Sequence, residues 1–210
     1  MSPPPILLIC GCRRYEEYLV AAIRRFRRQG GWDVVGLVGG DATQYDPDTS
    51  ILTVAAADTY EGLSAKLHAA FVWIMTNRPA TPGIFKTDDD MVFDQVALID
   101  TIYSNLSTPY WGVKVGTCSA GAIDSSRVGA RFTDTTLKPT HQAAIYCYGW
   151  GYWLSARALA IILASGNEYR SSYIEDICTG FVMNRSGIVP QRIRVPYKEE
   201  SRTPDLLLLK

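Results

Sequence analysis

The sequence predicts an α/β fold: an open sheet whose strands alternate with helices and are joined by right-handed crossovers. Two observations lead to this prediction. Short apolar runs of strand length recur through the first half of the chain, and segments with apolar residues at helical spacing lie between them. A chain of 210 residues forms one large domain with a proper core, or at most two small ones. No linker is visible, so we expect a single domain over residues 1–210.

The first half of the chain supplies most of the predicted sheet. Four apolar runs are predicted as strands: residues 6–12, 32–40, 50–56 and 83–89. Three segments are predicted as helices: residues 15–26, 58–77 and 95–106. Asp94 is placed to cap the last of these helices. Ligands of such sheets bind at the carboxyl ends of the strands, and the strand at 83–89 ends in acidic residues.

The second half of the chain has a different pattern. Three segments look like strands joined by loops: residues 110–118, 127–133 and 143–155. Helices are predicted at residues 156–165 and within 171–187, where Gly187 ends the second one. We expect these elements to extend the same sheet with strands of mixed direction.

The composition excludes several classes of function. Lys+Arg and Asp+Glu both number 21, so the charge balance indicates no nucleic-acid partner. Five scattered cysteines and two histidines far from any cysteine pair argue against a zinc site or a disulfide framework. No apolar run reaches the ~18 residues of a membrane span, and the N-terminal charges follow the apolar part, the reverse of a secretory signal. We therefore expect a cytoplasmic protein without a membrane span.

Three consecutive carboxylates, Asp88 to Asp90, follow an apolar run in the stretch IFKTDDDMVFD. Adjacent anions repel one another, and Lys86 can neutralise only one of them. An exposed turn would explain one or two aspartates, but not three bounded on both sides by apolar residues. The spacing of Asp88 and Asp90 suits a hard cation, Mn²⁺ or Mg²⁺, whose other ligands are waters and the phosphate oxygens of a substrate.

Two enzyme classes use a D-x-D motif in this way. In phosphatases and mutases of the haloacid dehalogenase class, the motif ends the first strand of the domain and its first aspartate is the nucleophile. In nucleotide-sugar glycosyltransferases, the motif lies mid-chain, after a nucleotide-binding half. About three predicted strands precede Asp88, so its position favours a glycosyltransferase. The phosphatase or mutase remains the alternative.

Four short segments carry patterns that belong together. They are DTYEGLSAK at residues 58–66, FKTDDDMVF at 85–93, YCYGWGYWLS at 146–155 and YIEDICTGF at 173–181. In this order and spacing they resemble the motifs of the galactosyltransferase/fringe family of inverting glycosyltransferases, over roughly residues 51–189. The first segment departs from the family pattern at Gly62, where the family has Asn. One such motif is a modest signal, whereas four in order are a strong one.

The resemblance implies a fold and a reaction. The fold would be that of A-type glycosyltransferases, with a Rossmann-like nucleotide-sugar-binding half over about residues 1–108 and an acceptor-binding half over about 109–210. The central sheet would be mixed and flanked by helices. The reaction would move a sugar from a UDP-sugar to a hydroxyl of a glycan or glycoprotein, with inversion. Asp88 and Asp90 would bind Mn²⁺ or Mg²⁺, and Asp176 would be the base that deprotonates the acceptor hydroxyl.

The acidic pair at 175–176 can also be interpreted from its neighbours. Ser172-x-x-Glu175 fits a capping box, which gives Glu175 a structural explanation at a helix start. Asp176 lacks that explanation, although a carboxylate also favours the first turn of a helix for electrostatic reasons alone. Thr179 and Gly180 lie one turn further on and are small enough to leave the carboxylate of Asp176 accessible.

Further donor-binding candidates come from position and charge. The first strand ends at GCRRY, where such sheets meet the nucleotide. Two lysines can meet the charge of a diphosphate, although a lysine on an amphipathic helix is usually only solvated. Two glycines in the third motif allow close approach of a ligand to the backbone. The predicted donor-binding residues are Gly11, Arg13, Arg14, Asp58, Lys66, Lys86, Asp88, Asp89, Gly149 and Gly151.

Aromatic residues are concentrated around these two glycines. Tyr148, Trp150, Tyr152 and Trp153 offer flat apolar surface of the kind on which sugars stack. The simpler interpretation is a packed aromatic strand, and we expect it to hold for at least two of the four.

Two departures set this chain apart from the family it resembles. No histidine follows His141, although family members usually have one there that completes the metal site. The N-terminal span and the disulfides of animal members are also missing, so the chain resembles a compact version such as a bacterium or a large DNA virus would encode. The glycosyltransferase domain of an algal-virus capsid-modifying protein is one example. The sequence stops inside an apolar run, so we expect that further domains can follow, and a non-catalytic sugar-nucleotide-binding module is the second alternative.

Overall fold

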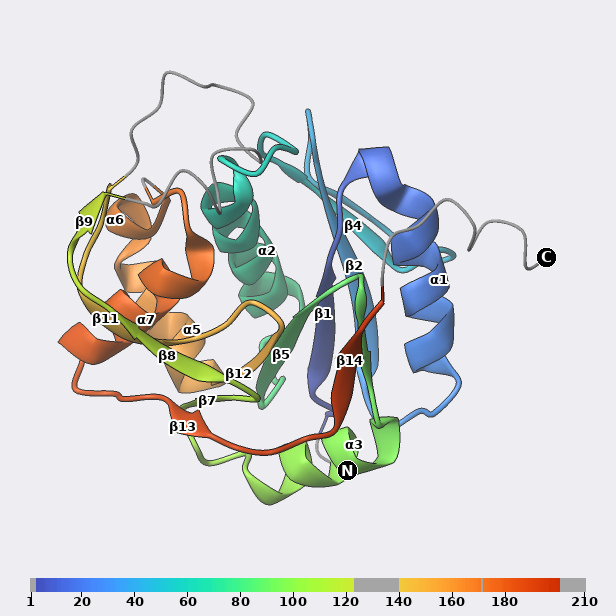
Figure 1. Cartoon of the computed structure of the whole chain (residues 1–210). Helices are drawn as coiled ribbons and strands as arrows, with labels where there is room; N and C mark the ends of the chain where they lie inside the picture. The colour runs from blue at the N-terminus through green and yellow to red at the C-terminus, as the bar shows by residue number, and fades with distance from the viewer. Residues whose placement is uncertain (1–2, 123–139, 171, 201–210) are drawn as a thin grey trace.

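A mixed sheet of eight strands forms the centre of the computed structural model (Figure 1). The structure describes residues 3–122, 140–170 and 172–200. The strand order of the sheet is β13-β7-β12-β5-β1-β2-β4-β3. In chain order, these strands are β1 (Ile6–Cys10), β2 (Asp33–Gly40), β3 (Gln44–Asp46), β4 (Ile51–Ala55), β5 (Gly83–Asp88), β7 (Tyr110–Gly112), β12 (Gly151–Ser155) and β13 (Gln191–Arg192).

The strands from the first half of the chain are mostly parallel. Strands β5, β1, β2 and β4 run in one direction, whereas β12 is antiparallel to its neighbours β5 and β7. Parallel strands are buried on both faces and therefore have nearly continuous apolar sequences. Strand β1 shows this, because Leu7 and Ile9 contribute to one apolar layer while Ile6 and Leu8 contribute to the other.

Helices cover both faces of the sheet (Figure 1). On one face, Leu19 of α1 (Glu16–Arg27) and Leu98 of α3 (Gln95–Ser104) pack in one core cluster. On the other face, the core contains residues of α2 (Leu63–Asn77), α5 (Ala156–Ala164), α6 (Gly166–Arg170) and α7 (Glu175–Arg185). A short 3-10 helix, η1 (Arg13–Tyr15), links β1 to α1. None of the described helices is long and apolar enough to cross a bilayer.

Within the described residues, three two-stranded sheets lie outside the central one. They pair β6 (Met91–Phe93) with β14 (Tyr197–Glu199), β8 (Val115–Cys118) with β11 (Ala144–Cys147), and β9 (Gly121–Ala122) with β10 (Thr140–His141). The first pair matters for the site, because it brings the segment after residue 195 beside the strand that follows the acidic triplet.

The predicted fold class and its principal elements are confirmed. The four strands predicted in the first half correspond to β1, β2, β4 and β5, and Asp94 caps α3 by accepting a hydrogen bond from the Ala97 N–H at 3.1 Å. The helix predicted from residue 58 begins only at Leu63. Two segments predicted as single strands are each divided: residues 110–118 form β7 and β8, and residues 143–155 form β11 and β12, separated by a turn. Strands β7 and β12 belong to the central sheet, whereas β8 and β11 pair with each other outside it. The strand predicted at 127–133 lies outside the described residues.

Candidate active site

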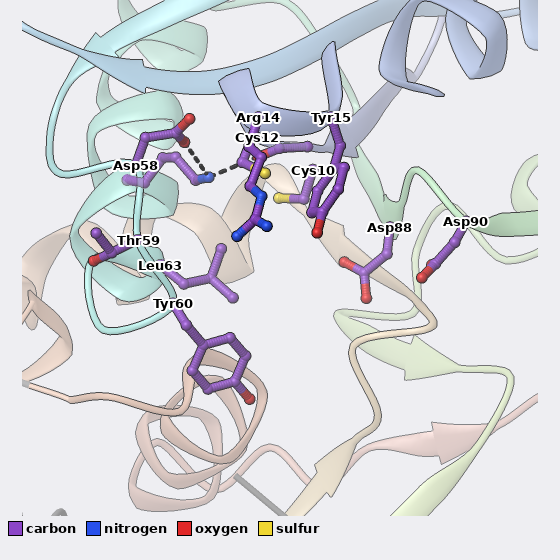
Figure 2. A pocket seen from close by; sticks show the side chains of 12 residues that line it. Cys10, Cys12, Arg14, Tyr15, Asp58, Thr59, Tyr60, Leu63, Asp88 and Asp90 are labelled. Atoms are coloured by element: carbon purple, nitrogen blue, oxygen red, sulfur yellow. Dashed lines mark hydrogen bonds and ion pairs between the residues drawn. The ribbon is translucent and has the colours of Figure 1, made fainter. Parts of the chain in front are cut away.

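A pocket of about 500 Å³ opens at the carboxyl ends of the parallel strands (Figure 2). Strand β1 ends at Cys10, and Cys10 lies opposite Asp88, the last residue of β5. The connection from β4 to α2 forms another wall. The pocket is lined by Cys10, Gly11, Cys12, Arg14, Tyr15, Asp58, Thr59, Tyr60, Leu63, Lys66, Asp88 and Asp90. Its position is the one where open α/β sheets bind their ligands.

Asp58 and Lys66 hold this wall of the pocket together. The Lys66 Nζ donates to Asp58 Oδ1 at 2.8 Å and to the Gly11 carbonyl at 2.7 Å. The Asp58 carboxylate also accepts the backbone N–H groups of Arg13, at 2.5 Å, and Gly39, at 2.8 Å. Burial by itself would raise the pKa of Asp58, but these donors outweigh it and hold the pKa below its ordinary value. The carboxylate therefore stays ionised and joins the ends of β1 and β2 to α2.

The arginines after β1 have different roles. The Arg13 guanidinium binds Glu16 and Thr53, each at 2.8 Å, and does not line the pocket. Arg14 does line it, beside Tyr15, with 5.4 Å between the Arg14 Cζ and the ring centroid. Figure 2 shows the side chains of Arg14, Tyr15 and Tyr60 projecting into the pocket. These side chains suit a nucleotide, because the aromatic rings can stack on its planar nucleobase and the arginine can meet the charge of its phosphates.

The acidic triplet is divided between the pocket and the interior. Asp88 and Asp90 both line the pocket, at the end away from Asp58 (Figure 2). Asp89 is only 4% exposed, and its N–H donates to the Cys10 carbonyl at 3.1 Å. A turn after β5 therefore directs the first and third carboxylates to one side and buries the second.

The pair Asp88 and Asp90 fits a hard cation that shares its ligands with a substrate. Within the part of the chain that the structure describes, no group of three or more His, Cys, Asp or Glu side chains could hold a metal by itself. Mg²⁺ and Mn²⁺ are commonly held by one or two carboxylates, with waters and phosphate oxygens as the remaining ligands. The two carboxylates at the pocket end fit that arrangement.

Lys86 connects the acidic triplet to helix α7. Its side chain is 1% exposed, and its Nζ donates to Asp88 Oδ1 at 2.7 Å, to Glu175 Oε1 at 2.9 Å and to the Gly149 carbonyl at 2.9 Å. Burial lowers the pKa of a lysine, but the carboxylates of Asp88 and Glu175 more than compensate and hold the pKa of Lys86 well above its ordinary value. Lys86 is therefore a permanent buried cation, and it does not line the pocket.

Glu175 is part of this network and not of a helix cap. It is the first residue of α7 and is 3% exposed, and its second oxygen accepts the Tyr152 hydroxyl at 2.7 Å. The N-cap residue is Ile174, which has no side-chain cap. The predicted capping box is therefore wrong, because tertiary contacts to Lys86 and Tyr152 take both oxygens of Glu175.

Asp176, the predicted base, follows directly and is half-buried. Its Oδ2 accepts the Gly149 N–H at 3.2 Å, and its Oδ1 accepts the Ile177 N–H at 2.8 Å. Burial, and then the neighbouring Glu175, raise the pKa of Asp176 from 3.8 to about 7, while Lys86 and the two N–H groups limit the rise. A carboxyl group with a pKa near neutrality can take up a proton and release it again at that pH.

The two glycines predicted to bind the donor have unequal positions. A Cβ at Gly149 would lie 3.2 Å from both Glu175 Oε1 and Lys86 Nζ, so only glycine leaves this network undisturbed. Gly151 is the first residue of β12, where a Cβ would lie 2.8 Å from the rings of Phe85 and Phe93. Neither glycine lines the pocket.

Most of the predicted site residues fall into two groups, and Arg13, Asp89 and Gly151 belong to neither. Gly11, Arg14, Asp58, Lys66, Asp88 and Asp90 line the pocket together. Lys86, Gly149, Glu175 and Asp176 form the adjacent network, which Asp88 shares. The pocket also contains residues that were not predicted, namely Cys10, Cys12, Thr59, Tyr60 and Leu63. The last three lie within the first motif, which already indicated that segment.

Comparisons with known proteins identify the family of this chain. The sequence profile of the galactosyltransferase family matches residues 33–194. Beta-1,3-galactosyltransferase 2 of Mus musculus is 25% identical over 134 residues, which are 63% of this chain and 32% of that protein. Lactosylceramide 1,3-N-acetyl-beta-D-glucosaminyltransferase B of Xenopus laevis is 25% identical over 150 residues, 70% of this chain and 39% of that protein. The chain thus spans between about a third and two fifths of the length of these curated relatives.

A solved structure supports the fold alone. A protein of Bacillus anthracis assigned as a glucose-1-phosphate thymidylyltransferase, in complex with sucrose, superposes with a TM-score of 0.50 at 9% identity. The superposition covers 94% of this chain and 89% of that one. The family profile, in contrast, takes in all four motifs and strands from both halves of the sheet, and the chain belongs to the galactosyltransferase family.

Proposed function

We propose that this chain is a metal-dependent inverting glycosyltransferase, which moves a sugar from a UDP-sugar to a hydroxyl group of a glycan or glycoprotein. The observation that carries the proposal is the pairing of two acidic sites. Asp88 and Asp90 line the end of the pocket, and Asp176 lies beyond them, connected through Gly149 and Lys86. Membership of the family removes the support for the phosphatase or mutase alternative.

The donor would lie along the pocket. The uridine would occupy the part lined by Arg14, Tyr15 and Tyr60, and the diphosphate would extend toward Asp88 and Asp90. A bound Mn²⁺ or Mg²⁺ would offset the charge that develops on the leaving diphosphate. These two aspartates would hold the cation together with the phosphate oxygens.

Asp176 would act on the acceptor. The acceptor oxygen attacks the anomeric carbon, the bond from that carbon to the diphosphate breaks, and UDP leaves with the bonding electrons. The proton of the acceptor hydroxyl passes to Asp176, whose pKa of about 7 leaves it half ionised at neutral pH and mostly ionised above it. Attack opposite the leaving group inverts the anomeric configuration in one step and needs no covalent intermediate.

Thermal unfolding in the presence of nucleotides tests the donor site. The relatives are named for galactose and N-acetylglucosamine transfer, so UDP-galactose and UDP-N-acetylglucosamine are the first donors to try. We expect UDP and a UDP-sugar to raise the Tm only with Mn²⁺ or Mg²⁺ present, and GDP to have a smaller effect. In the variant Asp90→Asn, the metal-dependent part of this shift should disappear. Equal responses to UDP and GDP that do not depend on metal would contradict the proposed donor.

A non-catalytic role is tested with the same protein. The protein is incubated with each UDP-sugar, with and without sugar acceptors, and mass spectrometry detects the transfer product or the free sugar released by hydrolysis. Transfer, or slow metal-dependent hydrolysis of one donor, supports the enzyme. Binding of UDP with neither reaction at any metal concentration would favour a sugar-nucleotide-binding module.

A further inference from the structure

Four aromatic rings form a row on the surface next to the base. We define the aromatic row as Tyr146, Tyr148, Trp150 and Tyr197. Successive ring centroids are 5.3, 5.4 and 5.8 Å apart. All four side chains are partly exposed, whereas Tyr152 and Trp153, which follow in the chain, are 0% exposed. Tyr152 and Trp153 are therefore fully buried in the core, whereas the rings of the row stay partly exposed, and Trp150 among them also packs against the core.

One end of the aromatic row lies against helix α7. A Cβ on Gly180 would lie 2.4 Å from the Tyr146 Cβ, so Tyr146 packs directly on the helix that carries Asp176. Burial, and next the charge of Asp176, raise the pKa of Tyr146, which shows that the phenol and the carboxylate are electrostatic neighbours.

The middle of the row is tied to the base itself. Gly149 lies between Tyr148 and Trp150 in the chain, and its N–H donates to Asp176 while its carbonyl accepts from Lys86. The rings on either side of this glycine therefore have a fixed position relative to the carboxylate that would accept the proton.

The other end of the row lies beside the acidic triplet. Tyr197 belongs to β14, where it is paired with Phe93 of β6, and β6 begins one residue after Asp90. The row thus runs from the base to the strand that follows the predicted metal ligands. A ligand bound on the aromatic row would therefore lie between Asp176 and the predicted metal ligands.

Lys114 adds hydrogen-bond donors to this surface. Its Nζ lies 4.5 Å from the ring centroid of Tyr148 and 4.2 Å from that of Trp150. Among the described residues it has neither an ion pair nor a side-chain hydrogen bond. The rings hold the ammonium group by cation–π attraction, which leaves its N–H groups able to donate to the oxygens of a ligand.

We propose that the aromatic row and Lys114 form the acceptor site, and that they bind a pyranose ring of a glycan. A pyranose has apolar C–H faces that suit the aromatic rings and hydroxyl groups that suit the ammonium. Tyr and Trp have the mixed apolar and polar character that such a ligand requires. A groove of about 370 Å³ that shares Tyr197 and is lined also by Arg192 and Arg194 gives room for further sugars. This inference rests on the proposed function, since it names the substrate that Asp176 would deprotonate.

Saturation-transfer NMR tests the site without requiring turnover. The probes are the methyl β-glycosides of galactose, glucose and N-acetylglucosamine, and lactose, each with the protein in the presence of UDP and Mg²⁺, which is diamagnetic. The variants are Trp150→Ala and Tyr197→Ala. The control is Tyr103→Ala, which removes a tyrosine that is 48% exposed and lies outside the row. Trp150→Phe keeps an aromatic ring in case the alanine variant at that position folds poorly.

We expect at least one probe to bind, and Trp150→Ala to weaken its binding about tenfold or more. Tyr197→Ala and Trp150→Phe should weaken it less, and Tyr103→Ala should leave it unchanged. Where transfer is measured, the loss should fall on the acceptor KM, while UDP binding stays as in the wild type. The acceptor site is overturned if the row variants bind the sugars as the wild type does, or if the wild type binds UDP but none of the probes. If the wild type did not bind UDP at all, that result would instead contradict the proposed donor site.

Discussion

Lys66 and Lys86 are both buried lysines that bind an aspartate of the site, but they connect different parts of the molecule. Lys66 binds the Asp58 carboxylate and the Gly11 carbonyl. All three of these residues lie within the first 66 residues of the chain. Lys86 binds two carboxylates, Asp88 and Glu175, and the second lies 89 positions further along the chain. The first lysine shapes a wall of the pocket. The second joins that pocket to helix α7, which carries Asp176.

The surroundings of the two lysines differ in the same way. The Asp58 side chain is 17% exposed and has two backbone N–H partners besides Lys66, so it keeps donors if the lysine is lost. The Glu175 side chain is 4% exposed, and within the described part of the chain its hydrogen-bond partners are Lys86 and the Tyr152 hydroxyl. A buried charge that loses its partner is much more costly than one that retains water and other donors. The Lys86 network, which joins the pocket to α7, is therefore more sensitive to substitution than the Lys66 contacts with Asp58 and Gly11.

Replacing the central cation should have the largest effect. The variant Lys86→Met leaves Glu175 buried without its countercharge, which typically costs about 3–5 kcal/mol of unfolding free energy. It should also abolish transfer, because the position of Asp176 depends on the same network. Urea unfolding of the purified variant measures the first effect, and an unchanged m-value would show that stability alone has changed.

A second substitution tests whether the unpaired charge of Glu175 causes the loss of stability in Lys86→Met. In Lys86→Met combined with Glu175→Gln, no buried carboxylate is left at α7, and the amide can still accept the Tyr152 hydroxyl. The double variant should therefore be more stable than Lys86→Met alone. A double variant that is less stable than either single variant would show that packing, and not charge, decides the loss.

Removing the base should have the next largest effect, confined to turnover. Asp176→Asn should lower the transfer rate by at least the ~10²–10⁴-fold that a positioned general base supplies. UDP and metal binding should remain, because Asp88 and Asp90 are untouched. A pKa raised to about 7 means that ionising Asp176 costs stability as pH rises from about 4 to above 7, so the neutral amide should not lower the Tm at pH 8.

The matched control for this variant is Asp100→Asn. Asp100 is an exposed aspartate on α3, away from both lysine networks, and its loss should change neither transfer nor stability. If Asp176→Asn transfers sugar at nearly the wild-type rate, the base lies elsewhere or the reaction retains configuration. Proton NMR of the anomeric centre in the product would then decide between these two.

Removing the pocket lysine should have a smaller effect than removing the central one. Lys66→Met leaves Asp58 with two backbone N–H donors and some contact with water, so we expect a cost of about 1–3 kcal/mol. Because Lys66 lines the pocket, UDP binding should also weaken. Urea unfolding and a UDP titration of the two lysine variants, done side by side, measure the difference. Equal costs for Lys66→Met and Lys86→Met would remove the distinction between the two sites.

The smallest predicted effect is a change with pH. The base must be ionised to accept a proton, and the pKa of Asp176 is about 7. The value of kcat/KM should therefore fall as pH drops through 7, by about tenfold for each further pH unit. The protonation of Asp176 should not by itself lower stability over the same range, since protonating a carboxyl of raised pKa favours the folded state. A rate that stays flat down to pH 5.5 would exclude Asp176 as the titrating base.

Much of the fold could be predicted from local patterns. The strands at β1, β2, β4 and β5 are continuous apolar runs because parallel strands are buried on both faces. The division of residues 143–155 into two strands was not predicted, because the turn at 148–150 contains aromatic residues, which are as typical of strands as the residues on either side. Packing, and not propensity, decides that Tyr152 and Trp153 enter the core while Tyr148 and Trp150 stay at the surface.

Within the site, motifs predicted which residues take part but not what each one does. Asp58, Lys66, Asp88 and Asp90 line the pocket as the motifs indicated. Glu175 had a sufficient local explanation in its capping-box spacing, and that explanation is wrong because its partner is 89 residues away. No spacing rule relates residues so far apart in the chain.

Local patterns in the sequence are enough to predict the α/β class, the four parallel strands and the position of the acidic triplet at a strand end. These depend on hydrophobic periodicity and on turn chemistry, which are local properties of the chain. The burial of Lys86 as a cation between Asp88 and Glu175, and the pKa of Asp176 near 7, depend instead on tertiary packing. Burial and the distance between charges set these properties, and both arise only when β5, the Gly149 turn and α7 are packed together.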